Sequence, residues 1–79
     1  MIHDELQAIL REVFGDENLE MTDDMTAEDV EKWDSLSHIN MIVAAEEHFG
    51  VRFKNSQIAR LQCVGDLKDL IMKKRPDLD

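Results

Sequence analysis

Apolar residues recur at helical spacing along most of the chain, and polar segments separate the apolar stretches. The first stretch contains Leu6, Ile9, Leu10, Val13 and Phe14. Apolar residues three and four positions apart lie on one face of a helix, so this spacing predicts an amphipathic helix. Gly15 follows directly and is expected to end the helix, because glycine readily adopts the left-handed conformation of a C-cap.

A second helix is predicted from Ser35 to the residue before Gly50, which is expected to end it. Its core face is predicted to comprise Leu36, Ile39, Ile42, Val43 and Phe49, with Ala44 and Ala45 allowing a close approach. Val51 and Phe53 follow the glycine and are expected to plug into the core.

Two further helices are predicted in the last third of the chain. A short one is capped by Asn55 or Ser56 and runs to about Gln62. The other runs from about Val64 to Lys74, and its apolar stripe comprises Val64, Leu67, Leu70 and Ile71. Pro76 prevents any continuation, since proline has no backbone N–H and clashes with the preceding turn.

Residues 16–34 read as a long irregular connection that is rich in Asp, Glu, Thr and Asn. Its few apolar side chains are expected to hold it against the helices: Leu19, Met21, Met25, Val30 and Trp33. The pattern predicts an all-α fold, a small four-helix bundle with three main helices, a short third helix and a long loop after the first. We expect one domain over residues 1–79.

Charge is distributed unevenly along the chain. The 79 residues carry 18 acidic and 9 basic side chains, for a net charge of −9, and residues 1–31 hold 11 of the acids with Arg11 as the only base. Nucleic acid is excluded as a ligand, because phosphate backbones require clustered Lys and Arg. The charge favours partners with basic docking surfaces, or it serves solubility alone.

Several other classes of protein are excluded. Cys63 is the only cysteine, so neither an intrachain disulfide nor a thiolate metal site can form, and we expect a small buried or half-buried thiol. The acidic residues between 23 and 31 lack the glycine and the spacing of a calcium loop, so no metal is expected. Neither a membrane-spanning run nor a secretory signal is visible, so we expect a cytoplasmic monomer that does not insert into membranes.

The most informative stretch is Trp33-Asp34-Ser35-Leu36. A serine at a helix start is usually the N-cap, but Asp34 already offers an oxygen for that purpose. The hydroxyl of Ser35 is therefore free to carry a phosphate-linked group beside the positive end of the helix. Leu36 is expected to anchor the turn in the core and so direct Ser35 outward.

At these residues the chain resembles the acyl carrier protein family. Asp34-Ser35-Leu36 opens a helix, Val64-Gly65-Asp66-Leu67 opens the last one, and the second helix continues with Ile39, Ile42, Val43, Ala44, Glu46, Glu47, Phe49, Gly50 and Val51. The resemblance covers nearly the whole chain.

The resemblance implies that a phosphopantetheinyl transferase attaches 4′-phosphopantetheine from coenzyme A to Ser35. The terminal thiol of this arm would hold acyl, aminoacyl or peptidyl intermediates as thioesters. The carrier itself would catalyse nothing. It would serve acyl-loading, condensing or acyl-transferring enzymes of fatty-acid, polyketide or related specialised biosynthesis, and the tether would raise the effective concentration of cargo.

In the family, the helix after the serine docks onto basic patches of partner enzymes. Glu46 and Glu47 match acids of that helix. Housekeeping carriers are more acidic at the positions of Ser37, His38 and Asn40. Together with Trp33, this difference predicts a specialised carrier. Its dedicated partners would use apolar and hydrogen-bonding contacts. Met41 falls off the predicted core stripe. It is interpreted either as an exposed, adaptable partner contact or as a residue packed against the loop or another helix.

Two other functions are open. A helical adaptor could keep the same fold and bind partners without a prosthetic group. An enzyme in which His38 activates Ser35 is disfavoured, since neither an orienting acid nor an oxyanion-binding device follows from the sequence. His3 and His48 lack a ligand pattern and are interpreted as surface residues.

Overall fold

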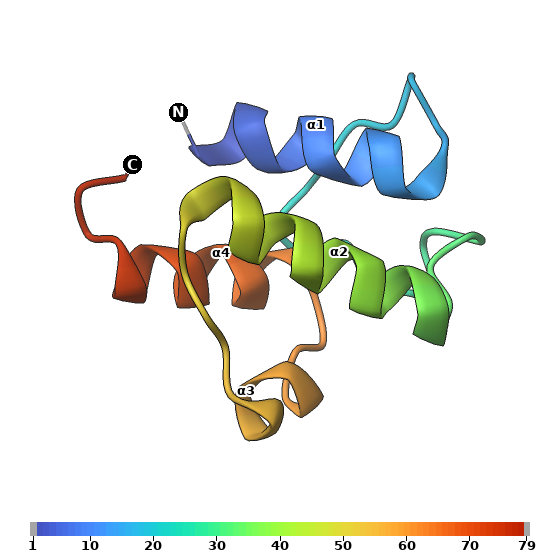
Figure 1. Ribbon diagram of the computed structural model, residues 1–79. Helices are drawn as coiled ribbons and strands as arrows, with labels where there is room; N and C mark the ends of the chain where they lie inside the picture. Colours follow the sequence, from blue (N-terminus) through green and yellow to red (C-terminus); the bar gives the residue numbers. More distant parts are fainter. Residues whose placement is uncertain (1, 79) are drawn as a thin grey trace.

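The computed structural model describes residues 2–78, and these form a small all-α bundle. Its helices are α1 (Ile2–Phe14), α2 (Ser35–Phe49), α3 (Asn55–Ala59) and α4 (Val64–Lys74). The first two run antiparallel, α1 packs against both α2 and α4, and the short α3 crosses below them (Figure 1). The predicted fold class, with its short third helix and long first loop, is confirmed.

The helix ends are set mostly as the sequence predicts. Gly15 and Gly50 have φ of 65° and 66°, the left-handed conformation of a C-cap. The third helix is shorter than predicted and ends at Ala59 rather than near Gln62. Its N-cap is Lys54 instead of Asn55 or Ser56, because the Lys54 N–H donates to the Gln57 side chain at 2.9 Å and starts the turn one residue earlier.

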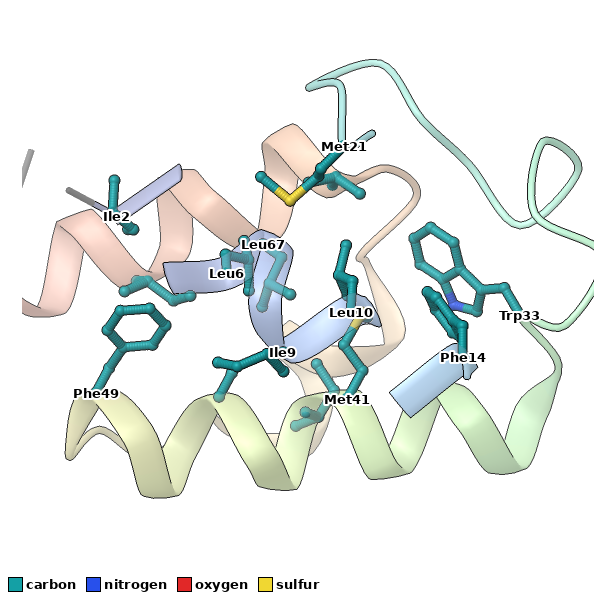
Figure 2. Close-up of a cluster of buried hydrophobic side chains, with 14 of the residues drawn as sticks. Ile2, Leu6, Ile9, Leu10, Phe14, Met21, Trp33, Met41, Phe49 and Leu67 are labelled. Atoms are coloured by element: carbon teal, nitrogen blue, oxygen red, sulfur yellow. The ribbon is translucent and has the colours of Figure 1, made fainter. Parts of the chain in front are cut away.

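The core lies between α1, α2 and α4 (Figure 2). It also takes in Val51 and Phe53, which are buried as predicted. Its most completely buried large side chains are Ile2, Leu6, Leu10, Met41, Ile42, Leu67, Ile71 and Val64.

The predicted core face of α2 is partly wrong. The side chains of Leu36, Ile39 and Val43 are 70%, 51% and 45% exposed, so Leu36 does not anchor the turn in the core. The buried residues of α2 are Met41, Ile42, Ala45 and Phe49. At about 100° per residue, the exposed three lie on roughly the opposite side of the helix from the buried four. The helix therefore carries two apolar stripes, and packing against α1 buries only one.

The long connection, residues 15–34, is held to two helices by backbone contacts. The Met21 N–H donates to the Gln7 side chain of α1 at 2.8 Å, and the N–H of Val64 at the start of α4 donates to Met25 O at 2.9 Å. Gly65 comes so close that a Cβ there would stand 2.8 Å from Asp23 O. Leu19, Met21 and Trp33 are buried, as predicted. The connection that precedes Ser35 is thus fixed to both α1 and α4.

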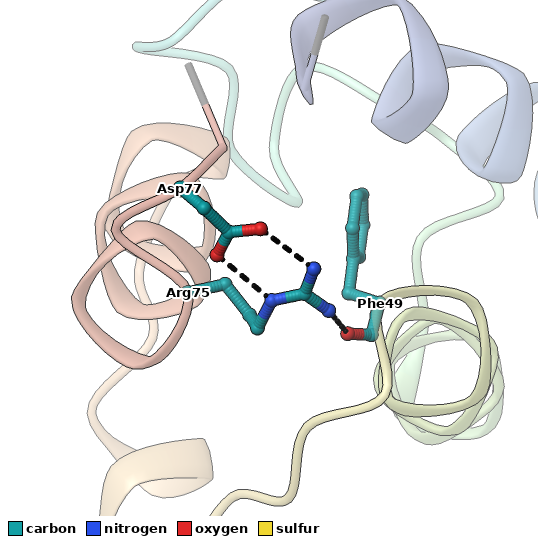
Figure 3. Close-up of polar contacts among 3 residues, drawn as sticks. All are labelled: Phe49, Arg75 and Asp77. Carbon is teal, nitrogen blue, oxygen red and sulfur yellow. Dashed lines mark hydrogen bonds and ion pairs between the residues drawn. The ribbon is translucent and has the colours of Figure 1, made fainter.

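The C-terminal end of α2 is tied to the end of α4 by Arg75 (Figure 3). Its Nη1 donates to Phe49 O at 2.6 Å, and its Nε and Nη2 bind the two carboxylate oxygens of Asp77 at 3.0 and 2.8 Å. The pairing with Asp77 raises the pKa of Arg75 and lowers that of Asp77. This contact satisfies one of the carbonyls left without a helical partner at the end of α2.

Candidate functional site

Ser35 is the first residue of α2, and its side chain is exposed. The residue before it, Asp34, is the N-cap, with extended backbone (φ −105°, ψ −173°). Its Oδ1 accepts from the Ser37 N–H at 2.8 Å. The capping role falls to Asp34, as the sequence predicts, and the Ser35 hydroxyl stands free at the positive end of the helix.

Hydrogen bonds from Ser37 hold the pKa of Asp34 below its ordinary value of 3.8. A carboxyl whose pKa is lower in the folded chain stabilises the fold fully above the unfolded pKa, and loses that effect as pH falls through the folded value. We therefore expect acid to weaken the start of α2 as pH falls below about 4.

This expectation can be checked with Asp34→Asn, since asparagine caps helices well and does not titrate. Urea unfolding followed by circular dichroism is measured for both proteins at pH 6 and pH 3. The stability advantage of the wild type over the variant should shrink at the lower pH. An equal difference at both pH values would show that the carboxylate of Asp34 contributes nothing specific.

Trp33 lies under the site, and its side chain is only 8% exposed. Its ring packs on Phe14 of α1, with centroids 5.6 Å apart, as Figure 2 shows. Its other neighbour is His38, whose Nδ1 accepts from Trp33 Nε1 at 3.1 Å, with the two ring centroids 6.2 Å apart and the ring planes within 16° of each other. The residue two positions before Ser35 is thereby fixed to both α1 and α2.

The residues predicted to dock partners are not all on the surface. Asn40 and Glu47 are exposed, and Ser37 and His38 are half-buried. The Glu46 carboxylate accepts from the Phe53 N–H at 2.9 Å, so it also holds the segment after α2.

Met41 is 1% exposed and belongs to the core, so its interpretation as a partner contact is wrong. It lies on the side of α2 that faces α1. The alternative, in which Met41 packs against another element, is the correct one.

Sequence reasoning missed the exposed apolar stripe of Leu36, Ile39 and Val43, which begins directly after Ser35. The signal was present, because positions 36, 39 and 43 share a helix face. They were assigned to the core since a single apolar stripe per helix is the usual pattern.

Other kinds of site find little support in the part of the chain that the structure describes. Between residues 2 and 78 no group of three or more His, Cys, Asp or Glu side chains could hold a metal ion. None of the helices described is long and apolar enough to cross a membrane. Cys63 is half-buried, as predicted, and His48 is exposed, with Nε2 3.3 Å from Glu5 Oε1.

Comparison with known proteins identifies the family. The model of the family described as "Phosphopantetheine attachment site" matches residues 4–71. The chain belongs to the acyl carrier protein family. An acyl carrier protein of Acidothermus cellulolyticus is 38% identical over 66 residues, which are 84% of this chain and 79% of that protein.

Further relatives agree with this assignment. A meromycolate extension acyl carrier protein of Mycolicibacterium aurum is 35% identical over 68 residues, 86% of this chain and 70% of that protein. The solution structure of a holo acyl carrier protein from Geobacter metallireducens superposes with a TM-score of 0.88, at 41% identity, over 96% of this chain and 87% of that one. The chain is therefore a phosphopantetheine-dependent acyl carrier, which works with biosynthetic enzymes and a phosphopantetheinyl transferase.

The start of α2 suits that prosthetic group. The group needs an accessible hydroxyl, and Ser35 is exposed. Its phosphodiester is anionic, and a helix N-terminus favours anions. Phosphopantetheine supplies a terminal thiol that holds acyl groups as thioesters.

Proposed function

We propose that Ser35 is the residue to which the phosphopantetheine arm is attached. The observation that carries this proposal is that Trp33, Asp34 and Ser35 have different roles at the start of α2. Asp34 caps the helix, Trp33 is fixed beneath it, and Ser35 alone of the three presents an exposed, uncharged nucleophile. The chain contributes no catalysis of its own in this proposal, since the transferase and later enzymes act on the arm.

The carrier function is tested by intact-mass measurement. The purified chain is incubated with coenzyme A and a broad-specificity phosphopantetheinyl transferase. We expect a mass gain of one phosphopantetheine with coenzyme A, and of one acyl-phosphopantetheine when acyl-coenzyme A replaces coenzyme A. No gain with several transferases would favour the adaptor that keeps this fold without a prosthetic group.

We further propose that partners dock on the stripe of Leu36, Ile39 and Val43, beside the exposed Asn40 and Glu47. This surface is apolar next to Ser35 and becomes acidic farther along α2. Such a composition fits the specialised partner set expected from the sequence, whose contacts near Ser35 are apolar and hydrogen-bonding. We also propose that residues 1–79 form a single domain and that the carrier acts in the cytoplasm.

Replacing Leu36 by alanine is expected to weaken partner binding. The side chain is 70% exposed, so its loss should leave the free energy of unfolding nearly unchanged. We expect Leu36 to be one of the few residues that carry most of the binding energy, and truncating such a residue costs more than about 1 kcal/mol, so the transferase should lose roughly fivefold to tenfold in kcat/KM.

The matched control is Ala8→Ser, an exposed small-to-small change on α1 that should leave kcat/KM unchanged. An unaltered kcat/KM for the well-folded Leu36 variant would remove that residue from the proposed docking surface.

A further inference from the structure

A shallow hollow lies directly beside Ser35. It has a volume of about 450 Å³, is open to solvent, and is lined by Ala27, Trp33, Asp34, Ser35, His38 and Ile39. Side chains from the long connection form one wall, and the first turns of α2 form the other. Because Ser35 is itself a lining residue, any group bound to its oxygen starts at the edge of the hollow.

The hollow is lined by apolar side chains and by the polar residues Asp34, Ser35 and His38. Ala27, Trp33 and Ile39 supply carbon atoms. His38 Nδ1 accepts from Trp33 Nε1 at 3.1 Å, so in the neutral ring the proton sits on Nε2, and that nitrogen is a donor. The same bond holds the indole and imidazole planes within 16° of each other. This bond restrains the Trp33 and His38 side chains before a ligand binds, which lowers the entropic cost of filling the hollow.

Resting on attachment at Ser35, we propose that this hollow binds the pantoyl segment of the arm, the part that directly follows the phosphodiester. That segment carries two geminal methyl groups and then a hydroxyl and an amide. The methyls match the apolar wall of Trp33 and Ile39, and the oxygens match the N–H of His38. The pantoyl segment is the part of the arm closest to Ser35, so no linker has to span the distance. The distal thiol stays outside and free to reach partner enzymes.

The test uses holo protein labelled with ¹³C and ¹⁵N and carrying an unlabelled arm, loaded to completion as verified by intact mass. Filtered NOE spectra should show contacts from the pantoyl methyls to the Trp33 indole and the Ile39 methyls. The tryptophan emission, which comes from a single residue, should shift between the apo and holo forms.

Two variants at exposed positions of α2 separate the hollow from the rest of the helix. Ile39→Ser removes part of the wall and should abolish the pantoyl contacts, while Val43→Ser, one turn farther along, should retain them. Contacts made instead by the distal thiol segment would overturn this proposal, as would a loaded wild type without pantoyl contacts. Absence of any mass gain would overturn the attachment at Ser35, and this proposal with it.

Discussion

Replacing Ser35 by alanine is expected to abolish loading with phosphopantetheine completely. The phosphodiester forms at the serine oxygen as 3′,5′-adenosine diphosphate leaves coenzyme A, and alanine offers no atom for that bond. The expected result is full mass gain for the wild type and none for Ser35→Ala, measured after incubation with coenzyme A and transferase. The fold should be unaffected, because the Ser35 side chain is exposed and Asp34, rather than Ser35, caps α2.

The matched control is Ser37→Ala on the same turn of α2. Ser37 contributes its backbone N–H to the cap, which alanine keeps, and its side chain is half-buried. This variant should load with one arm, as the wild type does. A mass gain in Ser35→Ala that disappears in Ser37→Ala would move the attachment point by two residues and contradict the proposal.

The exposure of Ser35 and the cap at Asp34 could be predicted from the sequence because the relevant signals are local. Asp34 before it supplies the cap, and the change from a polar segment to an apolar repeat marks the helix start. Gly15 and Gly50 mark helix ends for an equally local reason, the left-handed backbone that glycine tolerates. Such features depend on a few neighbouring residues, so they can be predicted without knowledge of the fold.

The orientation of α2 could not be predicted in the same way. The helix has apolar residues on two faces, and the choice between them depends on where α1 packs. The sequence pattern does not separate the two stripes, so it predicts Leu36, Ile39 and Val43 in the core, although they are exposed. Only the tertiary arrangement shows that Met41 is buried and these three are exposed.

The hydrogen bond between Trp33 and His38 could not be predicted from the sequence either. Its two residues are five positions apart, and one precedes the helix while the other lies within it. Their contact depends on the path of the connection, which is fixed by distant bonds to α1 and α4. The sequence therefore places His38 among the partner-docking positions of the helix, whereas it is half-buried beside Ser35.

The burial of Met41 has a large energetic consequence. Its side chain is 1% exposed, and Figure 2 shows it pointing from α2 toward the core. A chain of this length is stable by roughly 5–10 kcal/mol, so the loss of a single buried side chain removes a large share of the total. A residue on a partner surface would have no such effect.

Met41→Ala is expected to lower the free energy of unfolding by about 2–5 kcal/mol, measured by urea denaturation, because it deletes buried methylenes and leaves a cavity. Ile39→Ala, two residues earlier on α2 at a side chain that is 51% exposed, should change it by less than about 1 kcal/mol. If the alanine variant is too unstable to purify, Met41→Leu conserves most of the volume and should cost less than about 1.5 kcal/mol. Equal stability of the two alanine variants would contradict the burial of Met41 and return it to the surface of α2.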